Sequence, residues 1–231
     1  MIAGCEALAD DAWLLRTGAA DAPIDPAANA RAHRIAARLR ALSPPWLRDV
    51  VPAYAAVGVF FDPDAIAAHA VRDWLLAQCA EDTNDEAAGD TRIVEIPVRY
   101  GDDFGADLDE AAAALGLDRD TLIARHCAPL YTVAMLGFAP GFPYLLGLDA
   151  GLALPRLATP RTRVPAGSVG IGGAQTGIYP RESPGGWRLI GRTPLRLFDP
   201  GRERPSLLAP GDRVRFVAID DARFLALAEA A

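Results

Sequence analysis

A third of the residues between positions 137 and 211 are glycine or proline, and this density limits what that part of the chain can form. The segment holds 14 of the 21 glycines and 11 of the 19 prolines. Both residue types interrupt long helices, so regular structure here must be short and separated by turns. Large apolar residues such as Phe142, Ile171 and Trp187 stand between the turn residues. Short apolar runs between turns predict the strands of a β-barrel or sandwich with many loops.

The first 80 residues show a different pattern, in which strand and helix signals alternate. Residues 29–42 place apolar side chains at helical spacing and end before two prolines, which predicts an amphipathic helix. Residues 12–16 and 50–61 are rich in strand-forming residues, and a second helix is predicted between residues 66 and 75. This alternation predicts a small α/β sandwich.

The acidic stretch 81–91 contains no large apolar residue and interrupts both patterns, so we predict a linker there. We therefore divide the chain into an N-terminal domain, residues 1–85, and a C-terminal domain, residues 91–231. Within the second domain, alternating apolar residues predict a strand over 92–100. Asp107 is predicted to cap the solvent-exposed start of a short helix.

The composition excludes several classes of site. All 23 basic residues are arginine, and without lysine the chain cannot carry a P-loop, a Schiff-base lysine or a biotinyl-lysine segment. The net charge of −7 argues against nucleic-acid binding. The three cysteines are widely spaced, so neither a disulfide framework nor a metal site is expected. No apolar run reaches membrane-spanning length and the N-terminus does not resemble a secretory signal, so we expect a cytoplasmic protein without membrane contact.

Positive charge gathers in the glycine- and proline-rich segment, which carries a net charge of +5 in a chain whose total is −7. Four stretches in it combine glycines, aromatic residues and hydrogen-bonding groups: 137–148, 159–173, 174–187 and 190–200. They predict a surface for a small anionic ligand, although tight turns with aromatic residues in the core would give the same composition. The candidate binding residues are Arg161, Arg163, Gln175, Thr176, Tyr179 and Ser183.

His126 is the candidate general acid or base, because histidine changes its charge near neutral pH. The alternative is that His126 satisfies the end of a helix. Ser183 qualifies as a nucleophile only if His126 comes within reach of it.

The motifs GFAPGFPYLLGLD (137–149) and LPRLATPRTRVPAGSVGIGGAQTGIYPRESPGGWRLIGRTPLRLFDP (154–200) resemble the KipI/allophanate hydrolase subunit 1 family. Residues 51–63, 96–112 and 210–219 resemble further segments of that family in the expected order, so the resemblance covers essentially the whole chain. It implies an α+β fold, with a small N-terminal α/β sandwich and a C-terminal cyclophilin-like β-barrel.

The resemblance also implies a function, that of one subunit of a bacterial ATP-dependent 5-oxoprolinase complex that opens 5-oxo-L-proline to L-glutamate. The implied partners are a carboxyltransferase-like C subunit together with an A subunit of the LamB/YcsF type. ATP is then expected at a shared interface or on a partner, and the isolated chain is expected to be inactive. Two alternatives remain open: a histidine-kinase inhibitor of the KipI type, and allophanate hydrolase subunit 1 in urea degradation.

Residue types and motif membership together assign roles to the candidate residues. Arg161 and Arg163 are expected to hold a carboxylate or phosphate in a forked geometry. Gln175, Thr176 and Tyr179 are expected to orient the lactam N–H and C=O groups. On this basis Arg163→Ala is expected to abolish activity of the assembly while leaving the fold intact.

Overall fold

The computed structural model describes residues 2–19, 25–80 and 92–230. The chain forms two compact units, residues 1–90 and 91–231. The linker predicted at 81–91 lies outside the described residues, so the domain limits set by it stay a prediction. No helix in the described ranges is long and apolar enough to cross a membrane.

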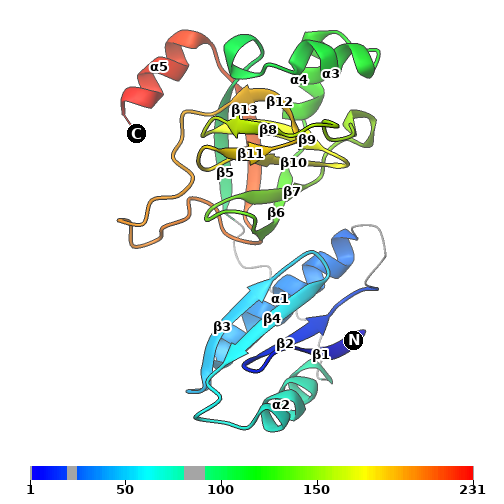
Figure 1. Ribbon diagram of the computed structural model, residues 1–231, viewed down its shortest axis with the longest axis vertical. Coiled ribbons are helices and arrows are strands. Elements are labelled where there is room, and N and C mark those ends of the chain that lie inside the picture. The colour runs from blue at the N-terminus through cyan, green and yellow to red at the C-terminus, as the bar shows by residue number, and fades with distance from the viewer. Residues whose placement is uncertain (1, 20–24, 81–91, 231) are drawn as a thin grey trace. The chain divides into compact units, whose positions relative to one another are not determined.

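In the part of the first unit that the structure describes, one antiparallel sheet and two helices enclose a common core (Figure 1). The strand order is β1-β2-β4-β3, with β1 (Gly4–Ala9), β2 (Ala12–Arg16), β3 (Leu47–Pro52) and β4 (Ala56–Phe61). Val57, Val59 and Phe61 alternate along β4 and are buried against α1 (Pro26–Leu42) and α2 (Ala68–Ala80). The predicted α/β sandwich is confirmed.

Helix α1 begins three residues before the predicted helix because of its capping sequence. The Asp25 carboxylate accepts hydrogen bonds from the backbone N–H groups of Ala27 and Ala28, and Pro26 occupies the first turn, where its missing N–H costs nothing. Ser43 ends the helix in a left-handed conformation. Strand β1 was not predicted, because its sequence GCEALA lacks the apolar alternation of a strand.

The second unit is a closed barrel in the order β10-β7-β6-β13-β5-β12-β9. Its strands are β5 (Ile93–Tyr100), β6 (Tyr131–Leu136), β7 (Pro143–Leu146), β9 (Ser168–Gly172), β10 (Gln175–Ile178), β12 (Arg188–Arg192) and β13 (Arg213–Ala218). Strands β5 and β13 are parallel, and the other neighbours are antiparallel. The predicted barrel is confirmed.

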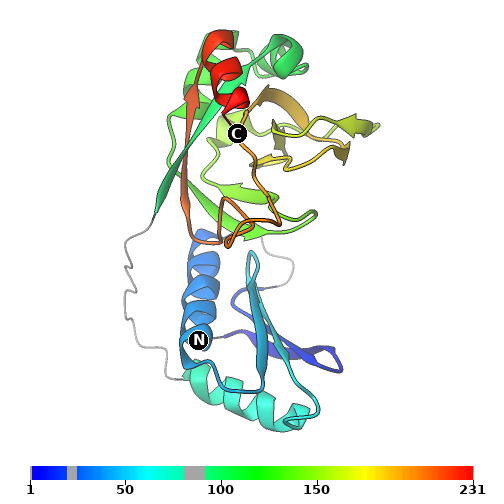
Figure 2. The same ribbon diagram turned by 90° about the vertical axis from the view of Figure 1, so that its left-hand side faces the viewer.

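Short helices and a separate two-stranded ribbon complete this unit. The helices are α3 (Leu108–Ala114), α4 (Arg119–Cys127) and α5 (Asp221–Glu229), with 3₁₀ turns at Asp102–Phe104 and Ala150–Leu152. Strands β8 (Arg161–Val164) and β11 (Ser183–Gly185) pair with each other and not with the barrel strands. Figure 2 shows this ribbon, in yellow-green, standing out from the barrel wall. Helix α5, which was not predicted, buries only Phe224.

An aromatic layer covers the outside of the barrel beneath the ribbon. Its buried aromatic members are Phe142, Tyr179 and Trp187. Val169 and Ile171 of β9 point into the barrel core, whereas Gly172 lies on the outer surface, where a Cβ atom would come within 2.6 Å of the Trp187 indole. The strand glycine therefore provides a flat surface for a tryptophan ring.

Candidate functional site

Side chains of the ribbon and of the aromatic layer come together where the ribbon crosses the layer. The register of the ribbon pairs Ser183 with Val164 and Gly185 with Arg161. A Cβ atom on Gly185 would overlap the Tyr179 hydroxyl, so the ribbon passes directly over that hydroxyl. The Arg156 guanidinium lies 5.8 Å from the centroid of the Trp187 ring.

We call this group the ribbon cluster; its members are Arg156, Arg161, Tyr179, Ser183 and Trp187. Burial raises the pKa of Tyr179, and the backbone N–H of Trp187 together with the charges of Arg156 and Arg161 opposes that rise. The phenol is therefore protonated at neutral pH. Because its oxygen accepts from the Trp187 N–H, its proton can be donated to a ligand.

Arg161 is fixed by the carboxylate of Asp107, which precedes α3 and is itself bonded to the barrel strand β12. Its Nη2 donates to Asp107 Oδ1 at 2.6 Å, and Asp107 Oδ2 accepts from the backbone N–H of Leu189 at 2.7 Å. Asp107 is only 3% exposed. It occupies the N-cap position of α3, as predicted, but its side chain makes no capping hydrogen bond and does not lie in solvent. The carboxylate accepts hydrogen bonds from β8 and β12 instead of from the first turn of α3.

Three buried side-chain nitrogen or oxygen atoms in the described residues have no hydrogen-bond partner: Arg161 Nη1, Ser183 Oγ and Arg188 Nε. Two of them belong to the ribbon cluster. Such an atom costs about 1–3 kcal/mol when it is left without a partner. A carboxylate or another small oxyanion that accepts from Arg161 Nη1 would remove that cost, so the cluster suits an anionic ligand.

Arg163 does not join Arg161. Its Nε and Nη2 donate to the two carboxylate oxygens of Glu182 at 3.0 and 2.9 Å, and its side chain is 77% exposed. This pair lowers the pKa of Glu182 and raises that of Arg163. The forked donor that was predicted for a ligand is thus occupied by a neighbouring acid.

His126 and Thr176 lie inside the barrel rather than at the ribbon. The Thr176 hydroxyl donates to Gly170 O at 3.0 Å, so it accepts from His126 Nε2–H at 3.0 Å. The remaining nitrogen, Nδ1, then accepts from the Tyr100 hydroxyl at 2.9 Å. Burial lowers the pKa of His126 to about 3. The fully buried, neutral ring has a structural position, not the accessible one that general acid–base catalysis would need.

Gln175 is buried at the start of β10, opposite Gly172. Side chains alternate along a strand, so Gln175 faces outward while Thr176 faces the core. Of the seven candidate residues, the structure brings together Arg161, Tyr179 and Ser183 at the ribbon. Sequence reasoning missed the partner Asp107, which lies 54 positions from Arg161. No local pattern could have connected the two.

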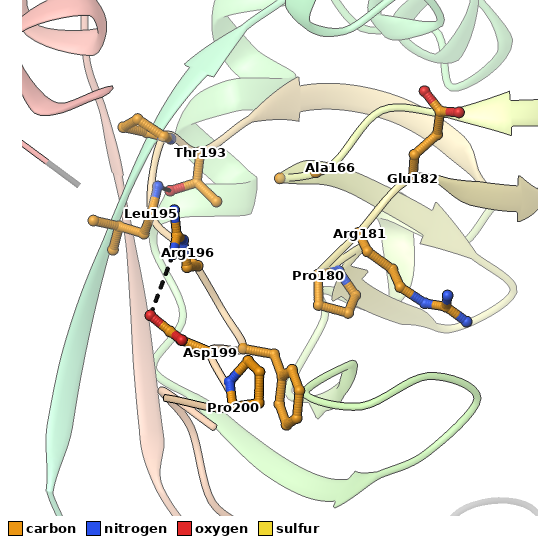
Figure 3. A pocket seen from close by; sticks show the side chains of 12 residues that line it. Ala166, Pro180, Arg181, Glu182, Thr193, Leu195, Arg196, Asp199 and Pro200 are labelled. Atoms are coloured by element: carbon orange, nitrogen blue, oxygen red, sulfur yellow. Dashed lines mark hydrogen bonds and ion pairs between the residues drawn. The ribbon is translucent and has the colours of Figure 1, made fainter. Parts of the chain in front are cut away.

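A hollow with a volume of about 440 Å³ lies beside the ribbon (Figure 3). Its lining comes from three of the four stretches singled out by composition, through residues 166–167, 180–182, 193–196 and 198–200. None of the seven candidate residues lines it. Its wall carries an ion pair of 3.2 Å between Arg196 and Asp199, while Arg181 points away from this pair in Figure 3.

Gly167 in this lining is hydrogen-bonded through its backbone to Tyr179 and to Thr193, so it connects three chain segments. Its replacement tests how tightly these segments are packed. Gly167 has a φ of +80°, and a Cβ atom there would overlap the carbonyl oxygen of Thr193. We expect Gly167→Ala to lower the free energy of unfolding by about 2 kcal/mol, from backbone strain and overlap together. Gly173→Ala is the control, since Gly173 has a φ of +66° with nothing within 4 Å of an added Cβ. Equal losses in urea unfolding would show that the overlap is relieved at no cost.

The class of protein is defined by comparison with known families. The family described as carboxyltransferase domain, subdomain C and D, matches residues 4–208. This match begins at β1, ends before β13 and includes the whole ribbon cluster.

Two proteins named as the B subunit of 5-oxoprolinase are similar to this chain over most of its length. That of Bacillus subtilis (strain 168) is 40% identical over 97% of this chain and 96% of the relative. That of Escherichia coli O157:H7 is 44% identical over 84% of this chain and 88% of the relative. The chain therefore belongs to the carboxyltransferase subdomain C and D family, together with these 5-oxoprolinase B subunits. The resemblance found in the sequence motifs is confirmed.

Solved structures agree on the fold. The crystal structure of TTHA0988 gives a TM-score of 0.79 at 43% identity and covers 90% of this chain, which spans 40% of that longer chain. The K. lactis urea amidolyase gives a TM-score of 0.71 at 22% identity, over 95% of this chain and 15% of that chain, and shows the fold alone. A urea amidolyase from Lachancea kluyveri matches by sequence over only 26% of this chain and 4% of its own length, at 42% identity. These partial matches do not favour the urea-degradation alternative.

Proposed function

We propose that this chain is the B subunit of an ATP-dependent 5-oxoprolinase, an assembly that opens 5-oxo-L-proline to L-glutamate. The observation that carries the proposal is the 40% identity to a 5-oxoprolinase B subunit over 97% of this chain. The ribbon cluster supports it, because 5-oxoproline is a small carboxylate with a lactam ring. Arg161 offers the carboxylate a donor, and Tyr179 offers the lactam oxygen another.

The reaction requires energy from ATP because the lactam is a stable amide. Transfer of the γ-phosphoryl group to the lactam oxygen would turn a poor electrophile into a good one. Water then adds to the ring carbon, the C–N bond breaks as the nitrogen takes a proton, and a second water releases inorganic phosphate. The balance is one lactam, one ATP and two waters giving glutamate, ADP and phosphate.

The residues of this chain contribute binding and orientation in this scheme. Arg161 holds the substrate carboxylate through Nη1, and the protonated Tyr179 donates to the substrate. Gln175 lies on the same outer face of the barrel, whereas His126 and Thr176 act from the core by holding β10 in place. Because the chain has no lysine, the permanently charged side chain that it can offer to a phosphate is arginine.

The remaining parts are expected on other proteins of the complex. We place ATP at a shared interface or on a partner, and the partners are a carboxyltransferase-like C subunit together with an A subunit of the LamB/YcsF type. The chain alone is then expected to be inactive.

Reconstitution tests this function. The purified chain is mixed with candidate A and C subunits, ATP and 5-oxo-L-proline, and glutamate and phosphate are measured. We expect glutamate only when all three proteins are present, with one phosphate released per glutamate. Inhibition of a histidine kinase without glutamate formation would instead assign the regulatory function, and turnover of allophanate the urea-degradation function.

A further inference from the structure

Asp107 stands at a helix N-cap, but its side chain does not form the hydrogen bonds that are usual at this position. An aspartate side chain at an N-cap ordinarily accepts from backbone N–H groups of the first helical turn. Here the Asp107 side chain makes no such bond, and the residue is 3% exposed. A buried carboxylate is costly unless it is paired, so its partners elsewhere explain why it is held there.

Both oxygens of this carboxylate are committed outside the helix. Oδ2 accepts from the Leu189 N–H at 2.7 Å, and the Asp107 N–H donates to Leu189 O at 2.8 Å. Gly105, two residues earlier, is pressed so closely against β12 that a Cβ atom would overlap Ile190 O. The barrel wall therefore fixes the carboxylate, leaving Oδ1 to meet Arg161 Nη2 at 2.6 Å.

The contact between Asp107 and Arg161 connects the barrel unit's wall to the β8–β11 ribbon, which share no backbone pairing of strands. Strand β8 pairs with β11 and not with the barrel strands, so backbone hydrogen bonds of the sheet do not fix Arg161 against the wall. With Nη2 on Asp107, the buried Nη1 is the donor left without a partner. The planar guanidinium group makes the direction of Nη1 follow from the position of Nη2.

We propose that Asp107 is a positioning residue of the ribbon cluster: it holds Arg161 so that Nη1 is presented to the carboxylate of the substrate. This inference rests on the proposed function. Asp107 acts through Arg161 and does not contact the substrate. Preorganisation of this kind lowers the cost of binding because the donor is already in place.

The test uses Asp107→Asn in the three-protein complex, with Asp109→Asn as the matched control. Asp109 is on the same helix, has a side chain 71% exposed and pairs with Arg119 at 3.2 Å. The amide that replaces the carboxylate at position 107 cannot accept from both donors. Its oxygen is expected to keep the fixed Leu189 N–H, which turns the NH₂ group against Arg161. We expect the KM for 5-oxoproline to rise about tenfold with kcat changed less than about threefold, and the control to match the wild type.

Two further measurements separate positioning from a general structural role. In a double-mutant cycle, Asp107→Asn is expected to add no loss to Arg161→Ala, whereas additive losses would overturn the inference. In the crystal structure of the Asp107→Asn chain, the Arg161 guanidinium is expected to leave its place beside residue 107. An unmoved guanidinium, or an unchanged KM, would also overturn it. If the wild-type complex makes no glutamate, the proposed function fails, and the crystal structure still decides whether Asp107 holds Arg161.

Discussion

Arg161→Ala is expected to lower the kcat/KM of the assembly for 5-oxoproline by about 100- to 1,000-fold. The variant loses the donor to the substrate carboxylate and leaves Asp107 buried without its cation. The expected loss corresponds to about 3–4 kcal/mol of transition-state stabilisation, at about 1.36 kcal/mol for each tenfold. Glutamate formation at several substrate concentrations, with the purified variant in the assembly, measures this loss.

Because the same change can lower stability, Arg161→Lys accompanies it. Lysine keeps a positive charge for Asp107 but cannot contact two acceptors with a planar fork. We expect Arg161→Lys to retain the wild-type melting temperature within a few degrees and still to lose most of its activity. Arg204→Ala is the control, since Arg204 is exposed in a loop of the same unit. Full activity in folded Arg161→Lys would exclude the forked contact.

Arg163 gives a direct comparison between the sequence-based expectation and the structure. Motif membership placed it beside Arg161, yet its guanidinium is exposed and already contacts both oxygens of Glu182. In the assembly we therefore expect Arg163→Ala to lose less activity than Arg161→Ala. Two arginines separated by one residue in the sequence thus acquire different surroundings, because one faces a buried acid and the other an exposed one.

The fold could be predicted where local pattern and tertiary packing agree. The strand expected at 92–100 is β5, Ile93–Tyr100, and the alternating residues of its second half, Ile96, Val98 and Tyr100, face the core. Helix α5 shows the opposite case: among its residues Phe224 alone is buried and Leu225 is 60% exposed, so packing leaves most of its apolar side chains unburied. Composition predicts turns or ligand contacts for the glycines of 159–173. Gly172 is instead a strand residue beneath Trp187, and only the position of that ring, 15 residues later, explains it.

The candidate site could be predicted by residue type but not by geometry. Composition identified Arg161, Tyr179 and Ser183, which do come together at the ribbon. Composition also selected Thr176, but this side chain faces the barrel core, where it contacts His126, while its strand neighbour Gln175 faces outward. Asp107 was assigned to solvent because an aspartate before a helix is usually a cap, and its contact with Arg161 depends on how the ribbon folds over the barrel.

The buried His126 gives the largest expected effect on stability. The pKa of its ring is lowered from 6.5 to about 3 in the folded chain by burial. Below pH 6.5 the unfolded chain therefore takes up a proton that the folded chain does not, and stability falls as the pH decreases from 6.5 toward 3. Between pH 7 and pH 4 the loss is about 3 kcal/mol.

His126→Gln tests this prediction, because glutamine keeps a donor and an acceptor but does not titrate. The variant is expected to be less stable than the wild type at pH 7, since its amide cannot reproduce both contacts, to Tyr100 and to Thr176. Its stability should nevertheless fall less steeply between pH 7 and pH 4, and carboxylates common to both proteins cancel in the difference. His69→Gln, at an exposed histidine of α2, should keep the wild-type slope. If urea unfolding gave the same slope for His126→Gln and wild type, the ring would have to take up its proton in the folded barrel, and the hydrogen-bond directions assigned to Tyr100, His126 and Thr176 would be wrong.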